Sequence, residues 1–406
     1  MKTERNFPAV QVTKKQEARL RAGHPWVYDT EITSGSQEIA NGALVDVMNQ
    51  KNHYLGTGLW SEQSKIRIRL LSANANEVFG DAFFARRTEY ALAYREKVMG
   101  EDFTSCRLIH GEADGLPGVT VDRYGDILAA EVLSYGMEQR KTVIYDALIS
   151  GLAKRGVTVR GIYERNEGAL RQKEGLPLEK GWYVHGAAVP EQTVFPITEN
   201  GIRYMVDVEN GQKTGFFLDQ KYNRLTVRKM AAGMRVLDCC THTGAFALNA
   251  AAGGAAAVTA VDISRRALDL AAENAALNGF NDIQFVEADV FAYLEEQLQK
   301  HAAYDLIILD PPAFTKSRRT FARASSGYQR LNALAMRILP RGGYLVTCSC
   351  SHFMHTEDFL EMLQRAAGDA GVGLRLVEER HASPDHPVML GIDETDYLKF
   401  FLLQIA

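Results

Sequence analysis

From about Gly233 onward, short apolar runs alternate with stretches of helical periodicity, and this alternation constrains the fold more than any other feature. Strands that alternate with helices are typical of βαβ units around a parallel sheet. Ser264 is expected to cap one helix and Gly279 to end it. The last run, 397–406, is expected to close the sheet as an edge or antiparallel strand. The expected strands lie in MRVLD, AVTAVD, IQFVEAD, YDLIILD and GGYLVTCSC.

The first three of these runs end in acidic residues, Asp238, Asp262 and Asp289. The carboxyl ends of parallel strands form the usual ligand crevice of an α/β sheet. Each acid could simply cap a helix. Alternatively, the three could hold one ligand, with Asp262 accepting hydrogen bonds from ribose hydroxyls and Asp289 and Val290 contacting an adenine. Gly244, in the first turn, lets the backbone pass close to that ligand. The chain has neither GxGxxG nor a P-loop lysine here, so dinucleotide or ATP phosphates are not indicated.

The fourth run ends in DPPAF, residues 310–314. Asp310 stands where a substrate must meet the cofactor, and the prolines stiffen the turn. Such a strand end could hold the edge of a flipped-out base. DPPAF is similar to the (N/D)PP(Y/F) signature of amino-methylating enzymes, although Ala313 departs from it. The pattern therefore indicates a methyl-transfer site and leaves the methylated atom open.

The fifth run ends in TCSCS, residues 347–351, which brings cysteines to the same edge. Cytosine C5 is a poor nucleophile, and a thiolate that adds to C6 activates it. Cys350 lies further out on the strand than Cys348, so Cys350 is the candidate nucleophile. Cys348 is expected to be a small core hydrophobe, as free cysteines often are. Cys239 and Cys240 are expected to pack at the cofactor turn.

The stretch from Pro311 to Thr356 contains no acidic residue. It begins beside the expected substrate site, and neutralised phosphates supply much of the affinity for nucleic acids. We expect Lys316, Arg318, Arg319 and Arg323 to contact RNA, although a solvated basic face is the alternative. The aromatic residues of the stretch could stack on unpaired bases. These aromatic residues are Phe314, Phe321 and Tyr328.

The N-terminal half shows a different pattern of expected strands and helices. Residues 1–75 contain short strands and turns typical of a small β-barrel, and a helix is expected over 81–98. A second α/β unit is expected over 103–190, with one amphipathic helix at 137–156. Its strands are expected in VTVDRY, ILAAEVL and VRGIYERN.

Length and composition exclude several classes of protein. A chain of 406 residues predicts two or three domains. No run approaches the ~20 apolar residues that span a bilayer, and the N-terminus lacks the apolar core of a signal peptide. The five cysteines have neither a disulfide framework nor a CxxC pair, so no metal site is expected. These features favour a cytoplasmic protein.

Taken together, the motifs resemble the bacterial large-subunit ribosomal-RNA methyltransferase I family, over nearly the whole chain. GHPWVYDTEI and SKIRIRLL resemble its RNA-binding PUA domain, and RLIHGEADGLPGVTVDRYGD resembles its central domain. ENGIRYMVDVENGQKTGFFLDQKYNR resembles the hairpin and helix before its catalytic sheet. The resemblance implies S-adenosylmethionine as cofactor, 5-methylcytosine in 23S rRNA as product, and Cys350 as nucleophile. It also places Asp219 and Gln220 near the cofactor.

The cofactor turn departs from the family pattern Cys-Cys-Tyr-Thr-Gly-Gly-Phe, because this chain reads CCTHTGAF. SCSHF likewise replaces a more usual SCSG-type segment. The family has no second cysteine after the motif aspartate, so Asp310 or a bound water would have to remove the C5 proton. The expected cofactor-binding residues are Gln220, Asp238, Thr241, His242, Thr243, Gly244, Asp262, Ile263, Asp289, Val290 and Asp310.

The sequence therefore predicts an α/β protein with a PUA-like barrel over 1–75, a central α/β domain over 76–190 and a Rossmann-like methyltransferase domain over 191–406. Cys350 and Asp310 are the expected catalytic residues, and RNA is the expected partner. The sequence leaves a homodimer open. Two other functions also stay open: a guanine or adenine N-methyltransferase, and a non-catalytic RNA-binding assembly factor.

Overall fold

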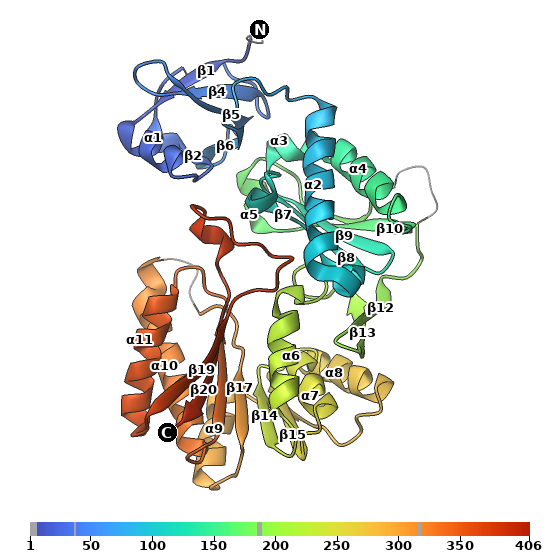
Figure 1. Ribbon diagram of the computed structural model, residues 1–406, viewed down its shortest axis with the longest axis vertical. Helices are drawn as coiled ribbons and strands as arrows, with labels where there is room; N and C mark the ends of the chain where they lie inside the picture. Colours follow the sequence, from blue (N-terminus) through green and yellow to red (C-terminus); the bar gives the residue numbers. More distant parts are fainter. Residues whose placement is uncertain (1–5, 36–37, 185–188, 315–317) are drawn as a thin grey trace. The chain divides into compact units, whose positions relative to one another are not determined.

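The computed structural model describes residues 6–35, 38–184, 189–314 and 318–406, and the chain divides into two compact units (Figure 1). The first unit contains residues 1–195, 206–218 and 384–395. The second contains residues 196–205, 219–383 and 396–406. The domain boundaries expected near residues 75 and 190 stay predictions. No helix in the described ranges is long and apolar enough to cross a membrane.

The first unit begins with a six-stranded sheet in the order β2-β6-β5-β4-β1-β3. Its strands share one core, formed mainly by valines such as Val10, Val45 and Val47. Pairing is antiparallel except between β1 and β4. The strands are β1 (Ala9–Val12), β2 (Trp26–Tyr28), β3 (Ile32–Ser34), β4 (Leu44–Met48), β5 (Tyr54–Trp60) and β6 (Ile66–Ser72).

Sequence periodicity missed the helix α1 (Lys14–Arg21) in this region. The helix is mostly polar, so it shows no apolar stripe. Its signal is the cap: the Thr13 side chain accepts a hydrogen bond from the backbone N–H of Gln16, three residues later. A threonine followed at this spacing by glutamine is the pattern of a capping box.

The rest of the first unit is built on a five-stranded sheet in the order β11-β10-β9-β8-β7. The predicted strands are confirmed as β8, β9 and β10, and the predicted helix over 81–98 is confirmed as α2. The helix predicted over 137–156 is two helices, because the Ser134 carbonyl closes a separate short turn at Met137 and Glu138. The elements are α2 (Asp81–Met99), β7 (Ser105–His110), β8 (Val119–Tyr124), β9 (Ile127–Val132), α3 (Tyr135–Glu138), α4 (Lys141–Ala153), β10 (Gly161–Asn166), α5 (Ala169–Lys173) and β11 (Glu179–Trp182).

A buried acid holds this sheet to a later segment of the same unit. Asp122, on β8, is fully buried and pairs through both oxygens with Arg107 of β7, at 2.9 and 2.8 Å. The Thr214 hydroxyl donates to the same carboxylate. The Tyr124 hydroxyl lies 3.2 Å from Thr214 and accepts the backbone N–H of Phe216. One carboxylate thereby fixes two strands and the segment 206–218.

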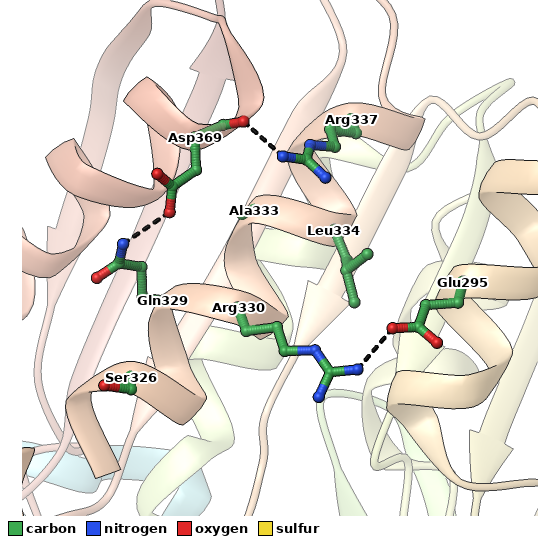
Figure 2. Close-up of a pocket in the computed structure, with 8 residues that line it drawn as sticks. All are labelled: Glu295, Ser326, Gln329, Arg330, Ala333, Leu334, Arg337 and Asp369. Atoms are coloured by element: carbon green, nitrogen blue, oxygen red, sulfur yellow. Dashed lines mark hydrogen bonds and ion pairs between the residues drawn. The ribbon is translucent and has the colours of Figure 1, made fainter. Parts of the chain in front are cut away.

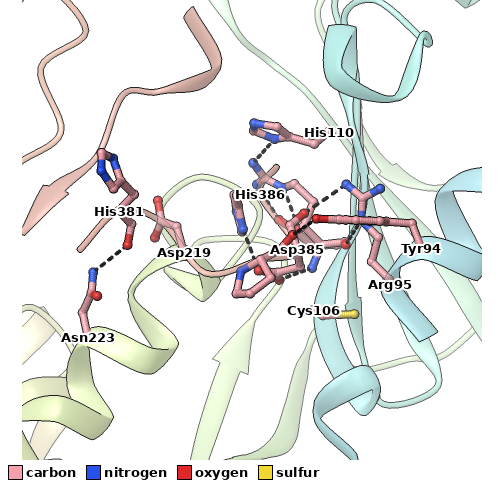
Figure 3. Close-up of polar contacts among 12 residues, drawn as sticks. Tyr94, Arg95, Cys106, His110, Asp219, Asn223, His381, Asp385 and His386 are labelled. Atoms are coloured by element: carbon pink, nitrogen blue, oxygen red, sulfur yellow. Dashed lines mark hydrogen bonds and ion pairs between the residues drawn. The ribbon is translucent and has the colours of Figure 1, made fainter. Parts of the chain in front are cut away.

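Residues Pro384–Thr395 leave the C-terminal sheet and pack within the first unit (Figure 3). Asp385 is fully buried, and its carboxylate accepts the backbone N–H of Arg107 at 2.8 Å. The Arg95 guanidinium donates to the Asp385 carbonyl at 3.0 Å, and His386 Nδ1 lies 3.0 Å from the Asp385 carboxylate. These contacts hold the segment Pro384–Thr395 against strand β7 and helix α2.

The second unit is built on a seven-stranded sheet in the order β16-β15-β14-β17-β18-β20-β19. The five predicted strands are confirmed, and they pair in parallel. The final run is antiparallel, as one expectation had it, but the edge position is wrong: β20 lies between β18 and β19. The strands are β14 (Arg235–Cys239), β15 (Ala257–Asp262), β16 (Gln284–Glu287), β17 (Leu306–Leu309), β18 (Tyr344–Ser349), β19 (Leu374–Arg380) and β20 (Lys399–Ile405).

Helices cover both faces of this sheet (Figure 1). Helices α6 and α7 pack in one core cluster, and α9, α10 and α11 pack in another. The predicted cap Ser264 is confirmed, since its side chain accepts the backbone N–H of Ala267. The hairpin β12 (Val194–Glu199) and β13 (Ile202–Asp207) precedes the sheet. The helices are α6 (Lys221–Met230), α7 (Ala245–Ala252), α8 (Arg265–Leu277), α9 (Val290–Gln299), α10 (Phe321–Ile338) and α11 (Thr356–Ala370).

We predict that Asp122→Ala destabilises the first unit by about 3–5 kcal/mol, because it leaves the buried Arg107 guanidinium without its counter-charge. Urea unfolding followed by circular dichroism measures the loss. Asp126→Ala is the matched control: Asp126 pairs with Arg160 on the surface, where both side chains are more than 40% exposed. The control should change stability by less than about 1 kcal/mol. Equal losses in the two variants would contradict the role given to Asp122.

Candidate functional site

The strand order of the second unit reverses between β14 and β17, whose following helices lie in opposite core clusters. Such a reversal opens a crevice at the carboxyl ends of the strands. Asp238, Asp262 and Asp310 lie at the carboxyl ends of β14, β15 and β17, and Asp289 follows β16 by two residues. The sequence-predicted acids therefore meet at one edge of one sheet.

Asp238 lies fully buried beneath this crevice. One of its oxygens accepts the Thr241 hydroxyl at 2.5 Å and the Ala247 backbone N–H at 2.9 Å. The other oxygen is buried and has no hydrogen-bond partner in the described part of the chain. Burial raises the pKa of this carboxyl to about 7, against the two hydrogen bonds that lower it. An unpartnered buried oxygen is the kind of atom that a bound cation would satisfy.

The turn after β14 has three residues with left-handed backbone: Cys240 (φ 61°), His242 (φ 51°) and Gly244 (φ 80°). Left-handed backbone at non-glycine residues is uncommon and clusters at ligand sites. A Cβ atom on Gly244 would also lie 2.8 Å from Leu248 Cδ1 and 3.0 Å from the Ala271 Cβ. Glycine is thus required here both for conformation and for space.

Asp262 holds the other side of the turn. Its two oxygens accept the backbone N–H groups of His242 and Ser264, each at 2.9 Å. A carboxylate has about four lone-pair positions, so it can still accept from hydroxyls. Burial lowers the pKa of His242, which keeps its imidazole neutral near pH 7. Ile263 is 71% exposed beside Asp262, so an apolar side chain stands open at the crevice.

The helix-capping alternative is confirmed for one acid. Asp289 is the N-cap of α9, and its side chain accepts the backbone N–H of Ala292 at 3.0 Å. Its carboxylate is nevertheless exposed, and Val290 beside it is buried. Asp238 accepts the backbone N–H of Ala247 in the first turn of α7 as well as the Thr241 hydroxyl, and Asp262 binds the turn between β14 and α7.

The Cys240 thiol, in the turn after β14, lies within electrostatic reach of all four acids. Burial raises the pKa of Cys240, and Asp262, Asp310, Asp238 and Asp289 raise it further. Carboxylates gathered around one point attract cations and repel phosphates. S-adenosylmethionine fits this donor set, because it carries a sulfonium, an ammonium, ribose hydroxyls and an adenine amine. The residues able to hold it are the acids, the 240–244 turn and Ile263.

Asp310 is oriented by a buried amide chain. Gln220 is 3% exposed and donates through Nε2 to Asp310 Oδ2 at 3.2 Å. Asn223 donates in turn to Gln220 Oε1 at 2.6 Å. Gln220 was expected near the cofactor, whereas sequence reasoning missed Asn223. Its signal is positional, since it lies one helical turn after Gln220.

Cys350 is half-buried just after β18, and the residues on either side of it are fixed by Tyr328. The Ser349 hydroxyl donates to the Tyr328 hydroxyl at 3.2 Å, and Ser351 Oγ lies 3.1 Å from the same atom. The backbone of Phe314, the last residue of DPPAF, also hydrogen-bonds this hydroxyl. Tyr328 therefore ties the turn that carries Cys350 to the turn that carries Asp310.

The other cysteines of this unit are kept as thiols. Burial raises the pKa of Cys239, Cys240 and Cys348. Cys239 and Cys348 are fully buried in the core, as expected for small apolar side chains. A high pKa disfavours the thiolate, which is the nucleophilic form.

The expectation that aromatic residues of the basic stretch stack on bases is wrong for Tyr328 and stays a prediction for the partly buried Phe314 and Phe321. Tyr328 is fully buried, and its ring lies 4.5 Å from that of Phe314. Phe314 also stacks on Phe291 at 6.5 Å, and Phe321 packs against the same core. The burial of Tyr328 reflects core packing, which a pattern of basic and aromatic residues does not distinguish from base stacking.

The basic stretch divides into two parts. Arg319 and Arg323 are exposed, and neither makes an ion pair within the described ranges, whereas Arg330 pairs with Glu295. Lys316 lies outside the described residues, and Arg318 begins the short 3-10 helix Arg318–Thr320. Among the described residues of the stretch, exposed arginines without an ion pair thus include Arg319 and Arg323 after DPPAF and Arg341 near its end.

A cavity of about 420 Å³ lies elsewhere, among helices α9, α10 and α11 (Figure 2). Its polar groups bind one another: Arg330 pairs with Glu295, and Gln329 donates to Asp369, both at 2.6 Å. None of the predicted site residues lines it. The cavity is therefore a hollow in the helical layer and separate from the crevice.

Comparison with known proteins agrees with this geometry. A family described as S-adenosylmethionine-dependent methyltransferase matches residues 182–404, and a PUA-like domain matches residues 10–73. The chain is 37% identical to the ribosomal RNA large subunit methyltransferase I of Klebsiella pneumoniae, over 99% of this chain and all of the relative. It is 39% identical to the protein of the same name from Shewanella amazonensis, over 96% of this chain and 97% of the relative.

Two solved structures share the whole architecture. One is a Streptococcus mutans protein provisionally named a SAM-dependent methyltransferase, with a TM-score of 0.80 and 25% identity. The other, a provisionally named methyltransferase complexed with SAH, has a TM-score of 0.82 at the same identity. Each covers 98% of this chain and is itself covered completely. S-adenosylmethionine is the cofactor.

Because the pKa of Asp238 is raised to about 7, we predict that affinity for S-adenosylmethionine rises with pH. Below pH 7 the carboxyl is protonated and neutral, and above it the carboxylate attracts the cationic cofactor. The gain should be about tenfold between pH 6 and pH 8, and calorimetric titration measures it.

Asp238→Asn is the control for this pH dependence, because the amide cannot titrate and the cofactor's own ionisation is unchanged. The affinity of this variant for S-adenosylmethionine should not show the rise of about tenfold between pH 6 and pH 8. Parallel profiles for the two proteins would show that Asp238 does not bind the cofactor's charge.

Proposed function

Since this chain belongs to the S-adenosylmethionine-dependent ribosomal RNA large subunit methyltransferase I family, we propose that it forms 5-methylcytosine in 23S rRNA, with Cys350 as nucleophile. One observation carries the proposal: the Tyr328 hydroxyl bonds Ser349, Ser351 and the backbone of Phe314. A thiol and a base-holding aspartate are thereby fixed at neighbouring strand ends beside the acid-lined crevice. An N-methyltransferase would have no use for the cysteine.

We assign the cofactor contacts along the crevice. Asp238 would attract the ammonium, with Thr241, Thr243 and Gly244 shaping the turn around it. Asp262 would accept from the ribose hydroxyls, with the neutral His242 beside it. The exposed Ile263 and the buried Val290 would contact the adenine, and Asp289 would accept from its amine. Gln220, which donates to Asp310, would orient this carboxylate for the methyl transfer.

The proposed reaction begins on the target base, which leaves its stack to reach the crevice. The Cys350 thiolate forms a bond to C6, and the electrons of the C5–C6 double bond make C5 nucleophilic. S-adenosylmethionine supplies the methyl group to C5. A base then takes the C5 proton, its electron pair restores the double bond, and the thiolate leaves C6. Asp310, or a water that it holds, is our candidate for this base.

RNA binding is assigned to two places. Arg319 and Arg323 are exposed and make no ion pair with any described residue, and Lys316 and Arg318 lie beside them in sequence. The PUA-like region, proposed over 1–75, precedes the proposed central domain (76–190) and catalytic domain (191–406). A ribosomal substrate places the protein in the cytoplasm.

Two rival functions have distinct products. A guanine or adenine N-methyltransferase would leave a methylated purine in rRNA, and a non-catalytic assembly factor would leave no methyl group. Nucleoside mass spectrometry of rRNA from a deletion strain, with and without the gene restored, separates the three. Loss and return of 5-methylcytidine is the outcome that the proposal requires.

We predict that Cys350→Ala reduces rRNA methylation to background while leaving affinity for S-adenosylmethionine unchanged. The reason is that the thiolate acts on the base and not on the cofactor. Transfer of a radiolabelled methyl group to rRNA measures the first, and calorimetry the second.

Cys348→Ala is the matched control, because its thiol lies two residues earlier, within β18, and is fully buried. That variant should keep its activity with a small loss of stability. Full methylation by Cys350→Ala would end the thiolate mechanism.

We also predict that Arg319→Ala combined with Arg323→Ala weakens rRNA binding and lowers the salt slope. Each lost phosphate contact removes about 0.7–0.9 from the slope of log affinity against log salt. Arg330→Ala is the control, because Arg330 lies on α10 like Arg323 and its guanidinium is paired with Glu295 of α9. If the double variant had the same salt slope as Arg330→Ala, Arg319 and Arg323 would not be part of the RNA interface.

A further inference from the structure

Lys399 is a buried lysine near the candidate nucleophile Cys350, and it has no part in the proposed reaction. It is the first residue of β20 and pairs in register with Ser349, the residue before Cys350. Only 2% of its surface is exposed. Lysine is almost never fully buried unless its charge is paired. Such a placement therefore needs a physical reason.

The ammonium of Lys399 bonds two neutral groups. Nζ donates to the carbonyls of Ser351, at 2.9 Å, and Tyr397, at 2.8 Å. Within the described ranges this lysine has no ion pair, although an ammonium has three N–H groups. Two ionisable groups act on its charge, Asp396 and the Cys350 thiol.

The remaining titratable groups around this cluster already have other partners. The Tyr328 hydroxyl, on α10, bonds Ser349 and Ser351. The Asp219 carboxylate accepts the Tyr397 hydroxyl, and Asp310 accepts from Gln220. Cys350 is thus the neighbouring group that can gain a charge during the proposed reaction.

We propose that Lys399 is a positioning residue for the methyl transfer, whose ammonium holds the Cys350 turn through the Ser351 carbonyl and stabilises the Cys350 thiolate. The inference rests on the proposed function, because it gives a role to the nucleophile named there. It adds a cation to the candidate site from β20, which is antiparallel to β18, the strand that precedes Cys350.

The charge state of Lys399 agrees with this role. Burial lowers its pKa to about 8, against the smaller opposing effects of Asp396 and Cys350. The lysine is therefore mainly an ammonium at pH 7 and loses its proton as the pH rises through 8. Its help to the thiolate should be largest below pH 8 and fade above it.

A purely structural role would need only N–H donors to the two carbonyls. Lys399→Gln keeps a donor and removes the charge, and Lys399→Arg keeps the charge. Lys399→Met, apolar and of similar length, repeats the measurement if the glutamine variant does not fold. Leu402→Ala is the matched control, because it removes a buried side chain from the same strand without altering its charge.

The test is the rate of alkylation of Cys350 by iodoacetamide between pH 5.5 and 9.5, read by peptide mass spectrometry that separates Cys350 from Cys348. An opposite charge nearby typically lowers the pKa of an ionisable group by one unit or more. We expect alkylation about tenfold slower at pH 7 in Lys399→Gln, with its pH midpoint shifted upward. Lys399→Arg and Leu402→Ala should keep the wild-type midpoint.

A wild-type midpoint in both Lys399→Gln and Lys399→Met would overturn the inference. This readout needs no RNA, so it separates the inference from the proposed function. Methylation by Cys350→Ala would end the proposed function even if the midpoint shifts. An unshifted midpoint with an inactive Cys350→Ala would end only the role of Lys399.

Discussion

The crevice depends on one buried carboxylate. Asp238 binds Thr241 and Ala247, so the turn between β14 and α7 folds around it. The left-handed residues of that turn then present backbone to the carboxyl edge of the sheet. Burying a carboxylate near other acids is costly, which is why its pKa is raised. A cationic cofactor would offset that cost, so under the proposed function the carboxylate that shapes the turn would also favour this ligand.

The opposite side of the crevice is organised by strand pairing. β18 brings Cys350 to the edge, while the antiparallel β20 returns Lys399 to the same level. Tyr328 is at once a core residue and a hydrogen-bonding centre between two turns. In the proposed function, Tyr328 and Lys399 would support the substrate chemistry and Asp238 the cofactor, and all three side chains are buried.

Sequence reasoning predicted the parallel strands β14 to β18, because each is a short apolar run that ends in a polar residue at the crevice. Sequence reasoning missed elements whose apolar residues do not follow the usual helical or strand periodicity. Helix α1 has no apolar stripe, and β19 exposes much of its length at the sheet edge. The edge position expected for the final run is wrong because β19, which the pattern did not reveal, pairs outside it.

The sequence predicted the acids and the cysteine of the candidate site, but it did not predict the buried side chains that hold them in place. Acids at strand ends follow from topology, whereas the buried Tyr328 and Lys399 depend on which side chains meet across the sheet. A polar or aromatic residue in a basic stretch suggests contact with nucleic acid, and only packing shows that Tyr328 faces inward.

The central claim is that Cys350 forms a bond to C6 of a cytosine, and a trapped adduct tests it most directly. In 23S rRNA fragments that contain 5-fluorocytosine, the fluorine cannot be removed as a proton is, so the covalent complex should persist. We predict an RNA–protein adduct that resists denaturation, requires S-adenosylmethionine and maps to the Cys350 peptide. Methylation of natural fragments, with no adduct on fluorinated ones or with an adduct at another residue, would contradict the account.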